Sequence, residues 1–387
     1  MKGFYGYRRP DGCVGVRNHV LILPVSVCAS DIAQAVASQV SGTVSFHNQN
    51  GCSQPEKDLQ LTLDVMAGFA ANPNIYGTVA IALGCESAQI KMVEQAIRAR
   101  TCKPLKSFVI QEEGGTLFTI AKAVRAAKDL CAEAQLLRRE LFPLSRLMVA
   151  TECGGSDPTS GLVANPVVGC MSDLVVEAGG TVVLSETTEM IGTEHILAQR
   201  AISPQVGEQI VSMVHRYERN LALVGEEVRT ANPSPGNKRS GITTLEEKSL
   251  GCIHKGGSTA IMDVVDYAKP IHKHGLVLMD TPGNDPSSVA GMVAGGAQIV
   301  VFTTGLGTPS GNPIAPVVKL TANRDTYQKM KDNTDFDASG VLFGEETLAA
   351  AGERLLELTI ETANGKMTSA ETLGYGEIAI MRASNYC

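Results

Sequence analysis

Three cysteines, each next to a glycine, lie where short apolar segments of the chain end. They are Cys52 in FHNQNGCSQ, Cys85 in LGCE and Cys153 in ECGGSD. If the apolar segments are parallel strands, their carboxyl ends lie at the sheet edge where open α/β sheets bind ligands. Three thiolates beside a polar pocket suit iron, either as one ion or as a cluster with an open iron site. A single cysteine more often only packs in a core, and spacings of 33 and 68 residues match no short metal motif.

The other seven cysteines are interpreted as packing residues, because they fall in predicted helices, strands or chain ends. They are Cys13, Cys28, Cys102, Cys131, Cys170, Cys252 and Cys387. The ten cysteines include no CxxC pair and follow no apolar signal segment, which favours thiols or metal ligands over a disulfide framework. Cys85 lies at a predicted helix start, where a reactive thiolate is favoured, so a nucleophile is a second interpretation of that residue.

A second polar cluster follows the apolar run 181–184 and contains Glu186, Glu189 and His195. These side chains could form an acid–base set or supply oxygen and nitrogen ligands to a metal. Alternatively, Glu194 and His195 only begin a helix, since glutamate is favoured in a first helical turn.

Further segments offer groups that could contact a substrate. His47 stands at a strand end five residues before Cys52, and Lys238 in PSPGNK could meet an anionic substrate. Glycine and hydroxyl groups in MDTPGNDP and FTTGLGTPSG can hold a carboxylate through backbone N–H groups, although turn formation alone explains them. Neither PSPGNK nor GLGTPSG matches GxxxxGK[ST], and no GxGxxG follows the first strand, so ATP and NAD are disfavoured.

The elements that position these residues alternate between apolar runs and helical patterns. The predicted strands cover 19–25, 42–46, 78–83, 105–110, 146–150, 181–184, 276–279, 298–302 and 316–320. The predicted helices cover 31–40, 55–71, 86–100, 116–141, 165–178, 205–224 and 345–364. Continuous apolar strands separated by helices indicate doubly wound, mostly parallel sheets. We predict an α/β protein with two or three Rossmann-like lobes, divided into 1–143 and 144–387, with a binding or hinge loop over 230–241.

Composition excludes several classes of protein. With 44% hydrophobic and 19% charged residues among 387, the chain is not disordered. A net charge of −7 argues against nucleic acid as a partner. No apolar stretch reaches the roughly 18 residues of a membrane span, so we expect a cytoplasmic protein with no membrane partner. A glycine-rich α/β enzyme of this kind is expected to be an oligomer.

The motifs follow one another in a recognisable series. They are HNQNGCSQ, LGCE, ECGGSD followed by SGLVANP, SET followed by GTEH, NPSPGNK followed by GITTLEEKSLG, MDTPGNDP and FTTGLGTPSGNP. In this order they resemble the large catalytic region of the altronate and galactarate dehydratase family. The resemblance extends over nearly the whole chain, from GYRRPDGCVGVRNHV to ETANGKMTSAETLG.

The resemblance implies a hydro-lyase that removes water from a sugar acid, altronate first, to give a 2-keto-3-deoxy acid. It also implies iron, since a Lewis acid stabilises the dianion formed when a proton α to a carboxylate is lost. On this basis iron binding is assigned to Cys52, Cys85 and Cys153. The candidates for proton transfer are His47, Glu86, Asp157, Glu186, His195 and Lys238. The candidates for substrate binding are Ser156, Asn237, Thr303, Thr304 and Gly305.

One departure from the family concerns the start of the chain. Single-chain members carry a small SAF-like β-rich domain in front of this region, whereas this sequence begins almost directly with GYRR. The resemblance therefore implies the large subunit of a two-subunit enzyme with a small SAF-like partner.

Three alternatives to the dehydratase remain. A related enzyme, the large subunit of sulfolactate sulfo-lyase, expels sulfite; its pattern lacks the cysteines matching Cys52 and Cys85 and keeps Cys153, which favours the dehydratase here. A non-catalytic scaffold subunit is the second alternative, and a cysteine-nucleophile hydrolase using Cys85 and His47 is the third.

Overall fold

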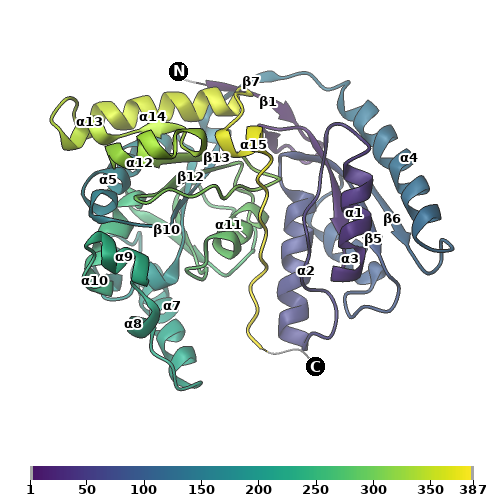
Figure 1. The fold of residues 1–387 in the computed structure, drawn as a ribbon, viewed down its shortest axis with the longest axis horizontal. Helices are drawn as coiled ribbons and strands as arrows, with labels where there is room; N and C mark the ends of the chain where they lie inside the picture. Colours follow the sequence, from purple (N-terminus) through teal and green to yellow (C-terminus); the bar gives the residue numbers. More distant parts are fainter. Residues whose placement is uncertain (1–2, 385–387) are drawn as a thin grey trace.

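The computed structural model describes residues 3–384, which fold into two α/β lobes lying side by side (Figure 1). A small antiparallel sheet in the order β2-β1-β7 brings the two ends of the N-terminal lobe together. Its strands are β1 (Gly3–Arg8), β2 (Val14–Gly15) and β7 (Glu140–Pro143). No described helix is both long and apolar enough to cross a membrane.

The N-terminal lobe is built on a four-stranded parallel sheet in the order β4-β3-β5-β6. Its strands are β3 (His19–Pro24), β4 (Thr43–Val44), β5 (Ile75–Ala82) and β6 (Leu105–Val109). Helices cover both faces, α1 (Ser30–Ala37) and α4 (Thr116–Ala134) on one, α2 (Glu56–Ala71) and α3 (Ile90–Arg100) on the other. Burial on both faces explains why β3 and β5 are continuous apolar runs.

The C-terminal lobe is built on a seven-stranded, entirely parallel sheet in the order β10-β11-β9-β8-β12-β13-β14. Its strands are β8 (Met148–Cys153), β9 (Thr181–Leu184), β10 (Ile261–Val265), β11 (Gly275–Met279), β12 (Ile299–Thr303), β13 (Val317–Thr321) and β14 (Phe336–Asp337). Helices α5 (Asn165–Glu177) and α14 (Leu348–Ala363) pack together over one face, and α11 (Asp285–Ala294) covers the other.

Further helices complete this lobe. Between β9 and β10 lie α6 (Glu194–Gln199), α7 (Pro204–Ala222), α8 (Val228–Ala231), α9 (Pro235–Ser240) and α10 (Leu245–Cys252). Later in the chain come α12 (Arg324–Lys329), α13 (Ser339–Leu342) and α15 (Ser369–Leu373).

Helices α2 and α11 hold the two lobes together. A Cβ on Gly68 of α2 would lie 2.3 Å from the carbonyl oxygen of Ala294, so only glycine lets the helices approach this closely. Asn72, just after α2, donates to the carbonyl oxygens of Val293 and Ala297 at 2.8 and 2.9 Å. Close helix packing and hydrogen bonds therefore both stabilise this end of the interface between the lobes.

The C-terminal segment crosses the beginnings of the same two helices (Figure 1, yellow). The Tyr267 hydroxyl donates to the carbonyl of Ser287 at 2.8 Å and accepts from the amide of Met381 at 3.4 Å. Asp58 accepts from the amide of Ala383 at 2.6 Å. Both helices thus begin on one side of the molecule. Since helices run opposite to the strands in such parallel units, the carboxyl edges of both sheets face that side.

The predicted α/β class with parallel sheets is confirmed, and two element predictions are wrong. The helix predicted over 116–141 ends at Ala134, because residues 140–143 pair with β1 as β7. The predicted loop over 230–241 contains helix α9, whose start is fixed by the Ser234 hydroxyl accepting from the amide of Asn237 and by proline at the first position.

Candidate active site

The loops after β8 and β12 leave two neighbouring strands at the centre of the seven-stranded sheet, where the direction of strand addition reverses. The chain enters at β8, adds β9, β10 and β11 on one side, and then places β12 on the other. Such a reversal is where open α/β sheets bind ligands. The two loops are joined by backbone hydrogen bonds of 3.1 Å from Gly154 to Thr303 and from Gly305 to Gly155.

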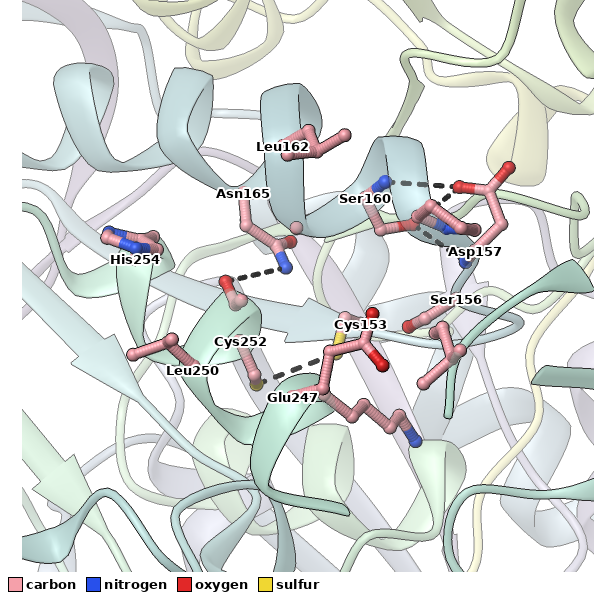
Figure 2. A pocket seen from close by; sticks show the side chains of 15 residues that line it. Cys153, Ser156, Asp157, Ser160, Leu162, Asn165, Glu247, Leu250, Cys252 and His254 are labelled. Carbon is pink, nitrogen blue, oxygen red and sulfur yellow. Dashed lines mark hydrogen bonds between the residues drawn. The ribbon is translucent and has the colours of Figure 1, made fainter. Parts of the chain in front are cut away.

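Two cavities open at this edge. The larger has a volume of about 570 Å³, within the usual range for small-molecule sites, and its lining includes Glu186, Glu189, Lys248 and Asp285. The smaller, of about 320 Å³, shares Cys153 and Lys248 with it. Figure 2 shows the smaller cavity, where Cys153 and Cys252 point toward one another from β8 and α10.

Lys255 is the centre of a buried ionic cluster with Glu186, Cys153 and Cys252. Its Nζ lies 2.7 Å from Glu186 Oε2 and 2.9 Å from Cys252 Sγ. Glu186 Oε2 also accepts from the amide of Cys153 at 3.0 Å, and the two sulfurs are 3.7 Å apart. Burial alone would lower the pKa of Lys255, but the ion pair with Glu186 and the other acidic groups packed around the ammonium raise it well above its ordinary value. The ammonium therefore stays charged and neutralises Glu186.

Cys153 keeps its proton in this cluster. The hydrogen bond with Cys252 and complete burial raise the pKa of Cys153 well above the ordinary value for a thiol. The cluster is thus built from one carboxylate, one ammonium and a pair of sulfurs of which Cys153 is a thiol.

The backbone of Glu186 is strained. Its φ of 67° is left-handed, which is uncommon for a residue with a side chain and is typical of functional sites. The Glu186 amide donates to Thr281 Oγ1 at 2.7 Å. This bond and the contact with Lys255 fix the carboxylate in one position.

Glu152 is a second buried acid beside the cluster. Its Oε2 accepts from the hydroxyls of Ser185 and Ser288 at 3.0 and 2.7 Å. Its Oε1 has no hydrogen-bond partner among residues 3–384. Burial and repulsion from Glu186 raise the pKa of Glu152 well above the ordinary value, which favours the protonated form of this side chain.

Asp285 at the start of α11 is the proton-transfer candidate of the larger cavity. Burial, followed by repulsion from Glu186, raises the pKa of Asp285 to about 7. A carboxyl group with this pKa can both give and take a proton near neutral pH, as general acid–base catalysis requires. Gly154 makes room for it, because a Cβ there would lie 2.1 Å from Asp285 Oδ2.

Lys248 supplies positive charge to the cavity. Its Nζ lies 2.7 Å from Glu189 Oε1 and 3.0 Å from Asn232 Oδ1. Burial lowers the pKa of Lys248, but attraction to Glu189 outweighs this effect and raises the pKa overall. The cavity therefore contains a permanent cation that can bind a substrate carboxylate.

Glu186 is the one predicted catalytic residue that lines the larger cavity. Asp157 lines the smaller cavity, where its carboxylate accepts from the amide of Ser160 at 3.1 Å and from Asn323 at 2.9 Å. His195 on α6 and Lys238 on α9 are exposed. The catalytic roles assigned to these residues stay predictions.

The other two predicted catalytic residues lie in the N-terminal lobe. His47 is exposed, with its Nδ1 3.9 Å from Asp31. Glu86 is buried and accepts from the amides of Leu83 and Gly84 at 2.8 and 2.5 Å, so it closes the turn after β5.

The predicted substrate-binding residues mostly shape the loops of the site. Ser156 lines the smaller cavity and Asn237 the larger, and the Asn237 amide donates to the carbonyl of Ser156 at 2.8 Å. The Thr303 hydroxyl donates to Asn165 at 2.7 Å, and the Thr304 hydroxyl accepts from the amide of Gly307 at 2.9 Å. A Cβ on Gly305 would lie 2.3 Å from Asp157, so glycine is needed for this loop to pack.

The three cysteines predicted to bind iron together belong to different sheets. Cys52 and Cys85 follow strands of the N-terminal lobe, and Cys153 ends β8 in the other lobe. Among residues 3–384, the group with three ligand atoms within 4.8 Å of one another is Cys153, Glu186 and Cys252.

That group has donor types that suit a transition metal. However, the Lys255 ammonium already contacts Glu186 and Cys252, and a metal ion would have to be buried beside this cation. This group therefore does not fit iron as it stands, and iron binding by Cys52, Cys85 and Cys153 stays a prediction.

Lys248, Cys252 and Lys255 are site residues that the sequence prediction missed, and Cys252 had been interpreted as packing. They are spaced four and three residues apart in KSLGCIHK, so they share one face of α10 and the turn after it. That spacing is the signal that could have found them.

The fold and the cavity define an α/β enzyme whose acidic site lies at the carboxyl edge of a parallel sheet. The D-galactarate/altronate dehydratase C-terminal domain matches residues 144–385, and the second domain of D-galactarate dehydratase/altronate hydrolase matches residues 6–135. The chain belongs to the D-galactarate/altronate dehydratase family, and this membership places it among the lyases.

Three relatives illustrate the range of the family. The (2R)-sulfolactate sulfo-lyase subunit beta of Chromohalobacter salexigens is 40% identical over 99% of this chain and 98% of its own length. The altronate dehydratase of Bacillus subtilis is 34% identical over 98% of this chain and 78% of its own length. The galactarate dehydratase (L-threo-forming) of Escherichia coli is 32% identical over 94% of this chain and 73% of its own length.

Proposed function

We propose that this protein is a hydro-lyase that removes water from a sugar acid of the altronate type and forms a 2-keto-3-deoxy acid. The observation that carries the proposal is Asp285, with a pKa of about 7, in one cavity with Lys248 and Glu186. The altronate and galactarate dehydratases among the relatives support the same reaction class.

The cavity residues divide the reaction between them. Lys248 binds the substrate carboxylate and stabilises the negative charge that develops when the neighbouring carbon loses its proton. Asp285 in its ionised form takes that proton and then delivers it to the leaving hydroxyl on the next carbon. Water leaves with the transferred proton, the carbon–carbon double bond forms, and the enol becomes the keto acid.

Glu186 influences the proton-transfer group without reacting with the substrate. Its carboxylate forms an ion pair with Lys255, and its charge is part of what raises the pKa of Asp285. We assign Glu186 the role of a positioning residue that sets the proton affinity of Asp285.

The chemistry of the cavity supports a polyhydroxylated substrate. Glu189 Oε2 is buried without a partner among the described residues, and Asn232 and Asn237 line the same cavity. Carboxylate and amide oxygens accept hydrogen bonds from sugar hydroxyls, which would leave no acceptor unsatisfied.

Sulfite release from sulfolactate is a second candidate reaction. The observation that favours it is the 40% identity to a sulfo-lyase subunit over nearly the full length of both chains. The same Asp285 would remove the α-proton, and sulfite would leave in place of hydroxide.

A small SAF-like partner subunit is part of the proposal. Its support is that one relative is named a subunit beta and matches over 98% of its length, whereas the altronate dehydratase matches over 78% of its length. Purification of the tagged chain from its native cells is expected to recover a small β-rich subunit, and recovery of the chain alone would contradict this part.

The test compares three substrates on the enzyme purified in this way. Altronate, galactarate and sulfolactate are supplied separately, and 2-keto acid and sulfite are measured. We expect keto-acid formation from altronate without sulfite. Sulfite release from sulfolactate alone would select the second candidate, and no turnover of any of the three would refute both.

A further inference from the structure

Two cysteine sulfurs lie in contact between the end of β8 and the end of α10. Cys153 Sγ and Cys252 Sγ are 3.7 Å apart and point toward one another (Figure 2). A disulfide holds its two sulfurs at about 2.0 Å, so a movement of roughly 1.7 Å would bring these two to bonding distance. Small rotations of both side chains can supply this movement.

The backbone on both sides of the two sulfurs is held in place. A Cβ on Gly251 would lie 2.8 Å from the Cα of Gly161, so the end of α10 packs directly against the segment 160–164 before α5. The Asn165 side chain donates to the Gly251 carbonyl at 3.0 Å. Cys153 is the last residue of β8, at the centre of the sheet. Packing and hydrogen bonds therefore keep the two sulfurs in contact.

The smaller cavity gives a small molecule access to both sulfurs. Cys153 and Cys252 are only 4% and 2% exposed, so a protein thiol or disulfide cannot reach them. Both residues nevertheless line this cavity, which has a volume of about 320 Å³. A water molecule occupies about 30 Å³ in the liquid, so hydrogen peroxide, with two oxygens, fits this space. The cavity therefore favours peroxide as the oxidant.

Lys255 and Glu186 give the two sulfurs different roles. Lys255 Nζ donates to Cys252 Sγ at 2.9 Å, and a cation beside a sulfur stabilises the negative charge that it carries when it attacks an oxidant. Cys153 Sγ instead donates to Glu186 Oε1 at 3.7 Å, and this carboxylate can accept its proton. Cys252 is therefore the sulfur that reacts first with peroxide, and Cys153 is the sulfur that attacks the oxidised Cys252.

We propose that Cys153 and Cys252 form a disulfide when hydrogen peroxide enters the smaller cavity. The Cys252 sulfur attacks one peroxide oxygen, the O–O bond breaks, and one water leaves with the Cys252 proton, so that Cys252 becomes a sulfenic acid. Cys153 Sγ then attacks the Cys252 sulfur, the S–O bond breaks, and a second water leaves with the Cys153 proton. Two thiols and one peroxide thus become one disulfide and two waters. The sulfurs are oxidised and the peroxide oxygens are reduced.

The disulfide would change the buried ionic cluster beside the larger cavity. It removes the Cys153 proton and with it the contact to Glu186 Oε1. It also leaves Lys255 beside a neutral disulfide sulfur in place of the free Cys252. Because Glu186 sets the proton affinity of Asp285, we expect oxidation to stop lyase turnover. This consequence rests on the proposed function, whereas formation of the disulfide does not.

The test treats the reduced full chain with hydrogen peroxide, blocks the remaining thiols with N-ethylmaleimide under denaturing conditions, and maps the peptides by mass spectrometry. We expect a peptide pair linked through Cys153 and Cys252, with loss of the maleimide label from both. Dithiothreitol added after denaturation and before blocking should restore both labels, because a disulfide is reducible and a sulfinic acid is not. Full labelling of either cysteine, a link to a different cysteine, or labels that dithiothreitol does not restore would overturn the proposal.

Two variants test the order of attack, and each is checked for native folding by circular dichroism. In Cys153→Ala, peroxide should leave Cys252 as a sulfenic acid that dimedone labels. In Cys252→Ala, Cys153 should take no dimedone at the same dose. No label on Cys252, or a label on Cys153, would overturn this order. Cys170→Ser is the matched control and should keep the disulfide, because Cys170 is half-buried in the same lobe but lines neither cavity.

The activity measurement separates this inference from the proposed function. Turnover of the productive substrate should fall in proportion to the fraction of chains that carry the disulfide. Unchanged turnover in fully linked enzyme would overturn the inactivating role of the disulfide. If the reduced enzyme turns over none of the three substrates, the proposed function is refuted, and the peptide map still decides whether the disulfide forms.

Discussion

Substituting Asp285 by asparagine is expected to make the protein more stable and less active at the same time. The structure raises the pKa of Asp285 from 3.8 to about 7, first through burial and then through Glu186. A difference of about 3 pKa units corresponds to about 4 kcal/mol of unfolding free energy when the group is ionised. Because the cavity is open to water, we expect about 2–4 kcal/mol, and asparagine removes this cost.

The gain has a defined pH dependence. A carboxyl group whose pKa is raised by folding destabilises the native state only when it ionises in the unfolded chain. The cost is therefore absent below pH 3.8, grows as the pH rises toward about 7, and is complete above that value. Asp285→Asn should raise the unfolding free energy more at pH 8 than at pH 5.

Urea unfolding at the two pH values measures the stability, and turnover of the productive substrate measures the activity. Loss of a general acid–base group should lower kcat about 10²–10⁴-fold. Asp332→Asn is the matched control, because Asp332 is exposed and should change neither quantity. If Asp285→Asn is no more stable than the wild type at pH 8, the burial argument is wrong. If it turns over normally, the assignment of Asp285 as the proton-transfer group is wrong.

Two further substitutions test the surroundings of Asp285. Lys255→Met leaves Glu186 buried without its cation and should lower the free energy of unfolding in urea by about 3–5 kcal/mol. Adding Glu186→Gln to this variant should recover much of the lost stability. If Lys255→Met alone is as stable as the wild type, the ion pair contributes nothing to stability. Gly154→Ala places a Cβ 2.1 Å from Asp285 Oδ2 and should lower the free energy of unfolding by about 1–3 kcal/mol and reduce kcat. Gly236→Ala is the control and should change little, because the nearest atom to its Cβ would be 3.7 Å away. Equal effects of the two substitutions would contradict the argument that Gly154 is needed for a close approach.

The sequence predicted that the site lies at the carboxyl edge of the sheet, but it identified only some of the residues that form it. Glu186 was found because it follows TVVL, a short run that predicts a buried strand, and such strands end at the ligand-binding edge. Lys255 and Cys252 were missed because they come from a helix and a turn, where lysine and cysteine usually have no role. Their contact with Glu186 depends on how the turn after α10 packs against α5 and β9, and local periodicity does not predict this packing.

The amino-acid sequence by itself determined the α/β class, the positions of most strands and helices, and the family. Local hydrophobic period and turn residues suffice for these, since each reports on its own segment. Only the tertiary structure decided which cysteines are neighbours. Strand order places Cys28, Cys52 and Cys85 at the edge of one sheet and Cys153 in another. Strand order depends on how all the apolar residues of a lobe pack into one core, and not on any single segment. The same cysteine spacing in the sequence is therefore compatible with Cys52 and Cys85 lying beside Cys28 or beside Cys153.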